Sequence, residues 1–225
     1  MYEFVFLDAD DTLLDFRKTE RAAITESFSR FGLEPTDEMI RRYSAINQET
    51  WERMERGEIT RDQVLIERFE RLFAEIGADV DPYAFEDVYQ YRLGQWSFLV
   101  EGAMEILEYL RPKYKLYIAS NGVAATQDSR FRAAGLSPWF DGIFISERVG
   151  RHKPEKEYFD RCFAQIPGFR HDRAIIVGDS LSSDILGGKN AGIATCWFNY
   201  RRKPAREDIV PDYTVYSLAE LRSIL

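Results

Sequence analysis

The sequence predicts an α/β protein with a doubly wound, Rossmann-like parallel sheet and an inserted all-helical cap domain. Five short runs of residues are apolar throughout, rather than alternating between apolar and polar residues, which is typical of strands buried on both faces of a parallel sheet. The five runs are residues 4–7, 116–119, 142–145, 174–177 and 193–198. Helix-length stretches separate the later runs, at residues 103–111, 122–134, 154–165 and 182–191. Because strands alternate with helices there, we expect βαβ units. A last short strand is predicted near residues 213–215, after a basic, proline-containing segment at residues 200–211 that we expect to be an exposed loop.

One long interval, from about residue 16 to residue 96, has no strand pattern. Its apolar residues recur at helical spacing, and within residues 59–76 they are Val64, Leu65, Phe69, Leu72, Phe73 and Ile76. Turn-forming residues divide the interval into four predicted helices. These turn-forming residues are Gly32, Pro35, Gly57, Gly77 and Asp81-Pro82. We therefore expect a core of residues 1–15 and 98–225, and a helical cap of residues 16–97 that lies over the carboxyl end of the first strand.

Composition is that of an ordinary globular protein and disfavours several kinds of partner. The formal charge of −8, from 30 basic and 38 acidic side chains, disfavours a nucleic-acid polymer, because an acidic surface repels a phosphate backbone. Cys162 and Cys196 have neither CxxC spacing nor a histidine cluster, so we expect two reduced thiols. The first residues lack a signal-peptide pattern, and no apolar run nears the roughly 20 residues of a membrane span. We expect a cytoplasmic protein without membrane contact.

The first candidate site follows the first predicted strand, where residues 8–12 read Asp-Ala-Asp-Asp-Thr. Acidic groups beside a buried strand are costly unless a partner such as a cation pairs with them. Strand alternation places Asp8 and Asp10 on the same side, at the sheet edge where open α/β folds bind ligands. A solvated acidic turn is the alternative explanation for this motif taken alone.

A second candidate site ends the next predicted strand. Ser120, Asn121 and Gly122 offer a hydroxyl, an amide and free backbone N–H groups at the start of a helix, which suit a phosphate. The same three residues also make an ordinary strand-to-helix turn with an N-cap, and that alternative stays open.

Two further candidates complete the set. Lys153 precedes Pro154, which we expect in the first turn of a helix. Because the helix dipole disfavours a cation at that end, Lys153 is better explained if it faces carboxylates and a phosphate. Asp179 ends another strand, directly after Gly178, and Asp184 follows in the opening of a helix, where it is also a favourable first-turn acid.

These groups occur in one order along the chain, and in a parallel sheet they meet at the same edge. They resemble the haloacid dehalogenase superfamily, specifically its phosphatases. The four motifs of that family correspond to residues 8–12, Ser120, Lys153 and residues 178–184. Within it the chain looks most like the bacterial house-cleaning pyrimidine 5′-nucleotidases, in residues 8–13, 47–51, 57–60, 178–180 and 190–199. One departure is Asp11, where glycine is usual in the wider superfamily.

The resemblance implies a Mg²⁺-dependent phosphomonoester hydrolase. It implies that Asp8 attacks phosphorus and becomes phosphorylated, and that Asp10 protonates the leaving oxygen and then activates water. Mg²⁺ is expected on the carboxylates of Asp8 and Asp179 and the backbone carbonyl of Asp10, while Asp184 orients a bound water or Lys153. The groups expected to bind the phosphate are Thr12, Ser120, Asn121 and Lys153, with the backbone N–H of Gly122.

The expected substrate is a small phosphorylated metabolite, a nucleoside 5′-monophosphate with pyrimidines preferred. The alternatives are a phosphosugar phosphatase or phosphomutase on the same scaffold and, ranked lower, a non-catalytic regulatory or binding protein. The presence of Asp10 argues against a haloacid dehalogenase. Hydrolysis of a carbon–halogen bond releases a halide ion and therefore needs no acid to protonate an alkoxide leaving group. A phosphonate hydrolase would need a cap amine, and the expected cap offers only Lys18, near its entrance. Aromatic candidates for stacking on a base, with core packing as the alternative, are Trp51, Tyr91 and Trp96.

Overall fold

The computed structural model describes all of residues 1–225 and contains one six-stranded sheet in which every neighbouring pair of strands is parallel. The order across the sheet is β3-β2-β1-β4-β5-β6, which puts the first strand in the middle. The strands are β1 (Phe4–Leu7), β2 (Lys115–Ser120), β3 (Gly142–Ile145), β4 (Ala174–Gly178), β5 (Ala194–Phe198) and β6 (Tyr213–Val215). The predicted doubly wound parallel sheet is therefore confirmed.

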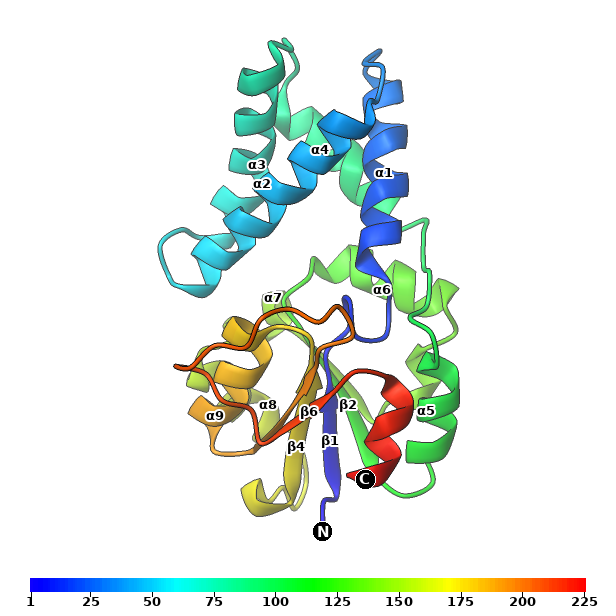
Figure 1. The fold of residues 1–225 in the computed structure, drawn as a ribbon, viewed down its shortest axis with the longest axis vertical. Helices are drawn as coiled ribbons and strands as arrows, with labels where there is room; N and C mark the ends of the chain where they lie inside the picture. The colour runs from blue at the N-terminus through cyan, green and yellow to red at the C-terminus, as the bar shows by residue number, and fades with distance from the viewer.

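Helices cover both faces of this sheet, because the side chains of each strand alternate between two cores (Figure 1). Val5 and Leu7 of β1 belong to a cluster with α5 (Ala103–Leu110) and the short helix η4 (Leu218–Ser223). Phe4 and Phe6 pack instead with α8 (Lys156–Phe163). The other helices of this part are α6 (Ala124–Ala133), α7 (Ser146–Val149), α9 (Leu186–Ala191), η1 (Ser137–Trp139), η2 (His171–Arg173) and η3 (Leu181–Ile185).

Four helices follow β1 and lie beyond the carboxyl ends of the strands (Figure 1). They are α1 (Phe16–Arg30), α2 (Asp37–Glu55), α3 (Arg61–Ile76) and α4 (Pro82–Leu93), and they enclose a separate cluster of 12 buried residues. Local sequence sets their ends. For example, Thr60 and Gln63 form a capping box at the start of α3, and Gly77 ends that helix in the left-handed conformation. The four helices predicted in this interval are all present.

The two segments that connect these helices to the sheet run side by side. Leu14 and Leu99 form an antiparallel bridge, and the backbone N–H of Asp15 donates to the carbonyl of Phe98 at 2.8 Å. The chain thus enters and leaves the helical insertion at one place. Both termini lie at the opposite end of the molecule (Figure 1).

Two local expectations need correction. The helix after Lys153 begins at Lys156, and Pro154 lies in the turn before it rather than in its first turn. The segment 200–211 is not simply an exposed loop, because Ile209 is buried against Trp197. Burial of the apolar side chain of Ile209 holds this part of the basic, proline-containing segment against the core. No helix of the structure is both long and apolar enough to cross a membrane.

Candidate active site

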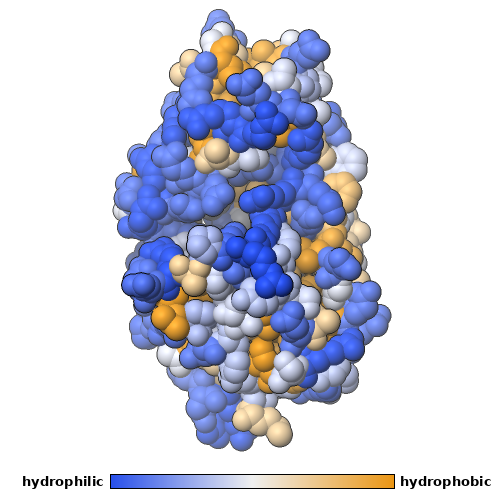
Figure 2. Space-filling model, viewed as in Figure 1, coloured by the Kyte–Doolittle hydropathy of each residue, from blue (hydrophilic) through white to orange (hydrophobic).

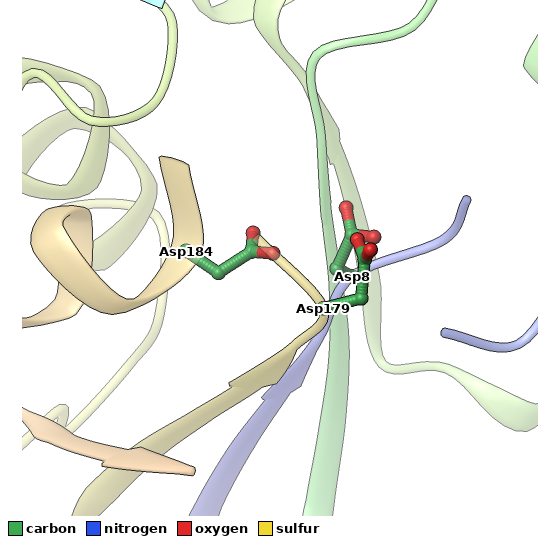
Figure 3. A group of neighbouring side chains, drawn as sticks. All are labelled: Asp8, Asp179 and Asp184. Carbon is green, nitrogen blue, oxygen red and sulfur yellow. The ribbon is translucent and has the colours of Figure 1, made fainter. Parts of the chain in front are cut away.

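Three carboxylates converge at the centre of the sheet edge. Asp8 follows β1 and Asp179 follows the neighbouring strand β4, at the point where the strand order changes direction. With Asp184 from η3, their carboxylate oxygens lie within 4.8 Å of one another (Figure 3). A Cβ on Gly178 would lie 2.2 Å from Cγ of Asp184, so only glycine allows this close approach.

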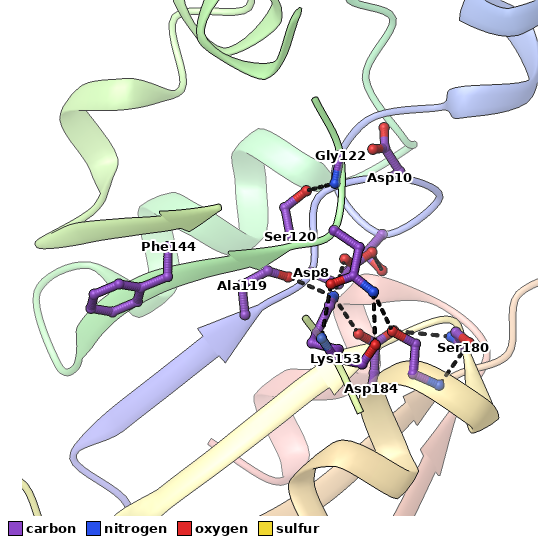
Figure 4. Close-up of polar contacts among 12 residues, drawn as sticks. Asp8, Asp10, Ala119, Ser120, Gly122, Phe144, Lys153, Ser180 and Asp184 are labelled. Carbon is purple, nitrogen blue, oxygen red and sulfur yellow. Dashed lines mark hydrogen bonds and ion pairs between the residues drawn. The ribbon is translucent and has the colours of Figure 1, made fainter. Parts of the chain in front are cut away.

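Lys153 lies beside two of these acids. Its Nζ donates to Oδ1 of Asp8 and Oδ1 of Asp184, both at 2.7 Å, and to the carbonyl of Ala119 at 2.6 Å (Figure 4). The side chain is only 2% exposed. Burial alone would lower the pKa of Lys153, but the adjacent carboxylates of Asp184 and Asp8 raise it above its ordinary value. The lysine is therefore charged at neutral pH.

The environment of Asp8 and Asp179 favours a further cation. Burial raises the pKa of Asp8 well above its ordinary value, Lys153 opposes that rise, and the neighbouring acids add to it. Burial likewise raises the pKa of Asp179, against the opposing charge of Lys203. Hard carboxylate oxygens gathered in a buried place are the donors that Mg²⁺ prefers, so these residues fit that ion. Asp184 is less free, because its Oδ1 bonds to Lys153 and its Oδ2 accepts from the backbone N–H of Ser180 at 3.1 Å.

The remaining predicted residues line the same edge. Thr12 is fully buried, and its hydroxyl donates to Oδ2 of Asp8 at 3.2 Å. The hydroxyl of Ser120 accepts from the backbone N–H of Gly122 at 3.1 Å. The side chain of Asn121 is occupied by Lys153, because its amide bonds both to the backbone N–H and to the carbonyl of that residue, each at 2.9 Å. The side-chain amide of Asn121 therefore positions the lysine.

Two residues of α6 that the sequence analysis did not single out hold Asp10. Arg130 donates to Oδ1 of Asp10 at 2.5 Å, and Gln127 donates to Oδ2 at 2.7 Å and also to the hydroxyl of Ser120 at 2.9 Å. Both residues are buried, each with 1% of its surface exposed. Their spacing of three residues places them on one face of the helix, and this pair of polar side chains after the Ser-Asn-Gly turn is the signal that could have revealed them.

Replacing Gln127 with methionine should lower kcat roughly ten- to a hundredfold with little change in KM, because one of the two donors that fix the Asp10 carboxylate is lost. Steady-state kinetics of Gln127→Met against Gln165→Met checks this, since Gln165 bonds only to a surface carbonyl of α8. An unchanged kcat in Gln127→Met would contradict a positioning role.

A cavity of about 680 Å³ lies over these residues, between the helical insertion and the sheet. Figure 2 shows a hollow there, surrounded mostly by hydrophilic residues. Of the aromatic residues considered for base stacking, Trp51 lines the cavity. Tyr91 is 62% exposed and lies outside it, and Trp96 stacks on Phe98 with ring centroids 5.4 Å apart.

Polar side chains from the helices of the insertion form a hydrogen-bonded network on the side of the cavity that the insertion lines. Glu20 accepts from Ser44 at 2.5 Å and from Asn47 at 2.7 Å, and Asn47 in turn accepts from Arg68 at 2.8 Å. Arg68 also donates to Glu86 at 2.6 Å, and both members of this ion pair are buried. The insertion therefore presents fixed polar groups, rather than apolar surface alone, to anything bound below it.

Glu55, at the end of α2, contacts η3. Its carboxylate accepts from the hydroxyl of Ser182 at 2.5 Å, and burial raises its pKa to about 7. The folded state therefore keeps this proton to a higher pH than the unfolded state, whose ordinary value is 4.5. Ionisation of Glu55 therefore lowers the free energy of unfolding. The loss is absent below pH 4.5, where the group is protonated in both states, and complete above about pH 7, where it is ionised in both.

Glu55→Gln should thus become more stable relative to the unsubstituted protein as the pH rises from 5 to 8, by roughly 1–3 kcal/mol. Urea unfolding at three pH values checks this, with the exposed Glu108→Gln as the control. A pH-independent difference between Glu55→Gln and the unsubstituted protein would show that Glu55 does not titrate in this range.

The comparisons agree with this geometry. A family model for haloacid dehalogenase-like hydrolases matches residues 2–192, and the chain belongs to this family of enzymes. It is a hydrolase.

The chain is similar over its whole length to three bacterial proteins. It is 41% identical to the HAD-hydrolase YfnB of Bacillus subtilis over 224 residues, which are 100% of this chain and 95% of that protein. It is 35% identical to the pyrimidine 5′-nucleotidase PynA of Streptococcus pneumoniae, covering 100% and 95% of the two chains. It is 34% identical to the pyrimidine 5′-nucleotidase YjjG of Escherichia coli, covering 100% and 98%. The predicted membership of the superfamily is confirmed.

Solved structures give the same result. The crystal structure of YfnB bound to magnesium superposes with a TM-score of 0.96 at 41% identity, covering 100% of this chain and 98% of that one. An L-2-haloacid dehalogenase from Xanthobacter autotrophicus superposes with a TM-score of 0.77 at 19% identity over 100% and 98% of the chains, and it shares the fold alone.

Proposed function

We propose that this hydrolase is a Mg²⁺-dependent phosphatase that works through phosphorylation of Asp8, and that its substrates are nucleoside 5′-monophosphates, pyrimidines preferred. The observation that carries the proposal is the meeting of Asp8, Asp179 and Asp184 at the sheet edge, where the buried Lys153 pairs with Asp8 and Asp184. Full-length similarity to two pyrimidine 5′-nucleotidases supports the choice of substrate.

Asp8 is the proposed nucleophile. Lys153 holds its Oδ1 and Thr12 holds its Oδ2, so the carboxylate is oriented before substrate arrives. An oxygen of Asp8 forms a bond to phosphorus as the bond from phosphorus to the leaving oxygen breaks. Water then attacks the phosphorus of phosphorylated Asp8 and releases inorganic phosphate and the free carboxylate. Covalent catalysis thereby divides one difficult displacement into two easier ones.

Asp10 is the proposed acid and base. Its carboxyl group gives a proton to the leaving oxygen in the first step, and its carboxylate takes a proton from the attacking water in the second, which restores the starting state. Gln127 and Arg130 donate from α6 to the two oxygens of Asp10, so they hold this carboxyl group in one orientation.

The proposed magnesium ligands are the carboxylates of Asp8 and Asp179 and the backbone carbonyl of Asp10. When bound there, Mg²⁺ offsets the negative charge that a phosphate brings to the acids. Asp184 is placed to orient Lys153, to which it bonds directly. The hydroxyl of Ser120, the backbone N–H of Asn121 and the ammonium of Lys153 are the proposed contacts for phosphate oxygens.

Residues 16–97 are proposed to act as a cap that selects the substrate. Their helices form the upper wall of the cavity, and a volume of about 680 Å³ is sufficient for a nucleotide-sized ligand. Trp51 is the proposed stacking partner for the base, because it is the one aromatic candidate of the three that lines the cavity.

A screen of phosphomonoesters with MgCl₂ tests this function. Phosphate release is expected to be fastest from pyrimidine 5′-monophosphates, slower from purine nucleotides and sugar phosphates, and to stop when EDTA is added. A preference for sugar phosphates would overturn the substrate assignment, and a requirement for a sugar bisphosphate would indicate a phosphomutase. No phosphate release from any substrate would overturn the proposed activity.

A further inference from the structure

The segment after β5 reaches back to the proposed metal site. Nζ of Lys203 donates to Oδ2 of Asp179 at 2.8 Å, and Arg201 donates to Oδ1 of Asp11 at 2.6 Å. We call residues 200–203 the basic loop. Neither of these basic side chains takes part in the proposed reaction, although each pairs with an acid at the sheet edge.

The backbone of Lys203 is firmly held. The side chain of Asn199, only 5% exposed, accepts from the backbone N–H of Lys203 at 2.7 Å and donates to its carbonyl at 2.9 Å. Arg202 lies between them with φ of 54°, in the left-handed region that residues other than glycine seldom adopt. A buried amide and an unfavoured backbone conformation thus fix a lysine whose side chain is itself 37% exposed.

Asp11 fixes the other end of the basic loop. Its Oδ1 accepts from Arg201, from the hydroxyl of Tyr200 at 3.3 Å and from the backbone N–H of Phe16 at 3.1 Å. Asp11 also has a left-handed φ, of 60°. Glycine would fit that conformation better but would provide no acceptor, so the aspartate is explained by the groups it holds.

The two lysines at the site pair with different acids. Lys153 bonds to Asp8 and Asp184, and the ion-pair partner of Asp179 is Lys203. A divalent cation bound to Asp179 and the ammonium group at 2.8 Å from the same carboxylate would repel each other strongly, since both are positive and close.

We propose that Lys203 is a built-in counter-ion that competes with the divalent cation for Asp179, and that Asp11 and Arg201 are positioning residues that keep it in place. The inference rests on the proposed metal site. Lys203 lowers the affinity for Mg²⁺ and thereby sets the ion concentration at which the site fills. When the concentration of Mg²⁺ is low, the ammonium group of Lys203 neutralises the charge of the Asp179 carboxylate.

Direct Mg²⁺ binding tests the proposal without relying on activity. Isothermal titration calorimetry with protein dialysed from EDTA should give a Kd for Lys203→Met that is roughly five- to tenfold lower than that of the unsubstituted protein. Arg201→Met should change the Kd in the same direction by a smaller factor. Arg206→Met is the matched control, because Arg206 pairs with the exposed Asp208 on the same segment, and its Kd should not change.

Thermal unfolding supplies a second measurement. The rise in Tm on saturation with Mg²⁺ should be larger for Lys203→Met than for the unsubstituted protein, because tighter binding to the folded state stabilises it more. If Lys203→Met does not fold, Lys203→Gln removes the charge while keeping a donor, and the same direction is expected. Equal or weaker Mg²⁺ binding in the variant that folds would overturn the role of Lys203. Absence of saturable binding by the unsubstituted protein would instead contradict the proposed metal site and with it the proposed function.

Discussion

Asp8→Asn should lower phosphate release by roughly 10⁴-fold or more with every substrate, because the amide oxygen cannot form the phosphorylated intermediate. Acid-quenched samples of the unsubstituted protein should carry a phosphoryl group on the peptide that contains Asp8, and samples of the variant should not. Mass spectrometry of that peptide together with a phosphate-release assay checks both expectations.

The fold should survive this substitution. Since burial raises the pKa of Asp8, its ionised form costs stability at neutral pH, and removing the charge should leave the free energy of unfolding unchanged or higher. Asp160→Asn is the control, because Asp160 is an exposed partner of Lys156 and should retain full activity. More than about one hundredth of the original activity in Asp8→Asn would mean that another residue is the nucleophile.

Lys153→Met should give the largest loss of stability, about 3–5 kcal/mol in the free energy of unfolding at pH 8, together with loss of activity. The reason is that the carboxylates of Asp8 and Asp184 would then be buried without their cation. The loss should shrink as the pH falls, because the pKa of the buried Asp8 is raised and its protonation removes one of the unpartnered charges. Urea unfolding in EDTA at several pH values measures this.

A second substitution separates charge from packing. Asp184→Asn combined with Lys153→Met should recover part of the lost stability, because one of the two unpaired charges is removed. Lys156→Met is the control for loss of a lysine, since its ion pair is exposed and should contribute less than about 1 kcal/mol. If Lys153→Met and Lys156→Met lose equal stability, the buried ion pairs do not stabilise the folded state.

The sheet and the heart of the site were predictable because both depend on local pattern. Continuous apolar runs specify strands in the interior of a parallel sheet, and β1 and β3 begin and end where these runs place them. Parallel strands then bring their ends together, which is why Asp8 and Asp179 meet although they lie far apart in the sequence.

What the sequence did not reveal depends on contacts between distant segments. The rotation of α6 decides that Gln127 and Arg130, rather than other polar residues of that helix, face Asp10. The return of the loop after β5 depends on Ile209 finding an apolar site against Trp197. The placement of Lys203 on Asp179 depends on the side chain of Asn199, which bonds to the backbone of that lysine. The amide of Asn121 turns to the backbone of Lys153, a choice of rotamer that spacing along the chain does not determine.

The side-by-side linkers also bear on how new specificities arise in this fold. Asp15 and Phe98 are joined by one backbone hydrogen bond, so the ends of the helical insertion are neighbours. An insertion with adjacent ends can be exchanged for another without redirecting the chain on either side. On the proposed division of roles, the chemistry of the acids on the sheet and the substrate choice of the insertion can change independently, when a different set of helices replaces the one between residues 15 and 98.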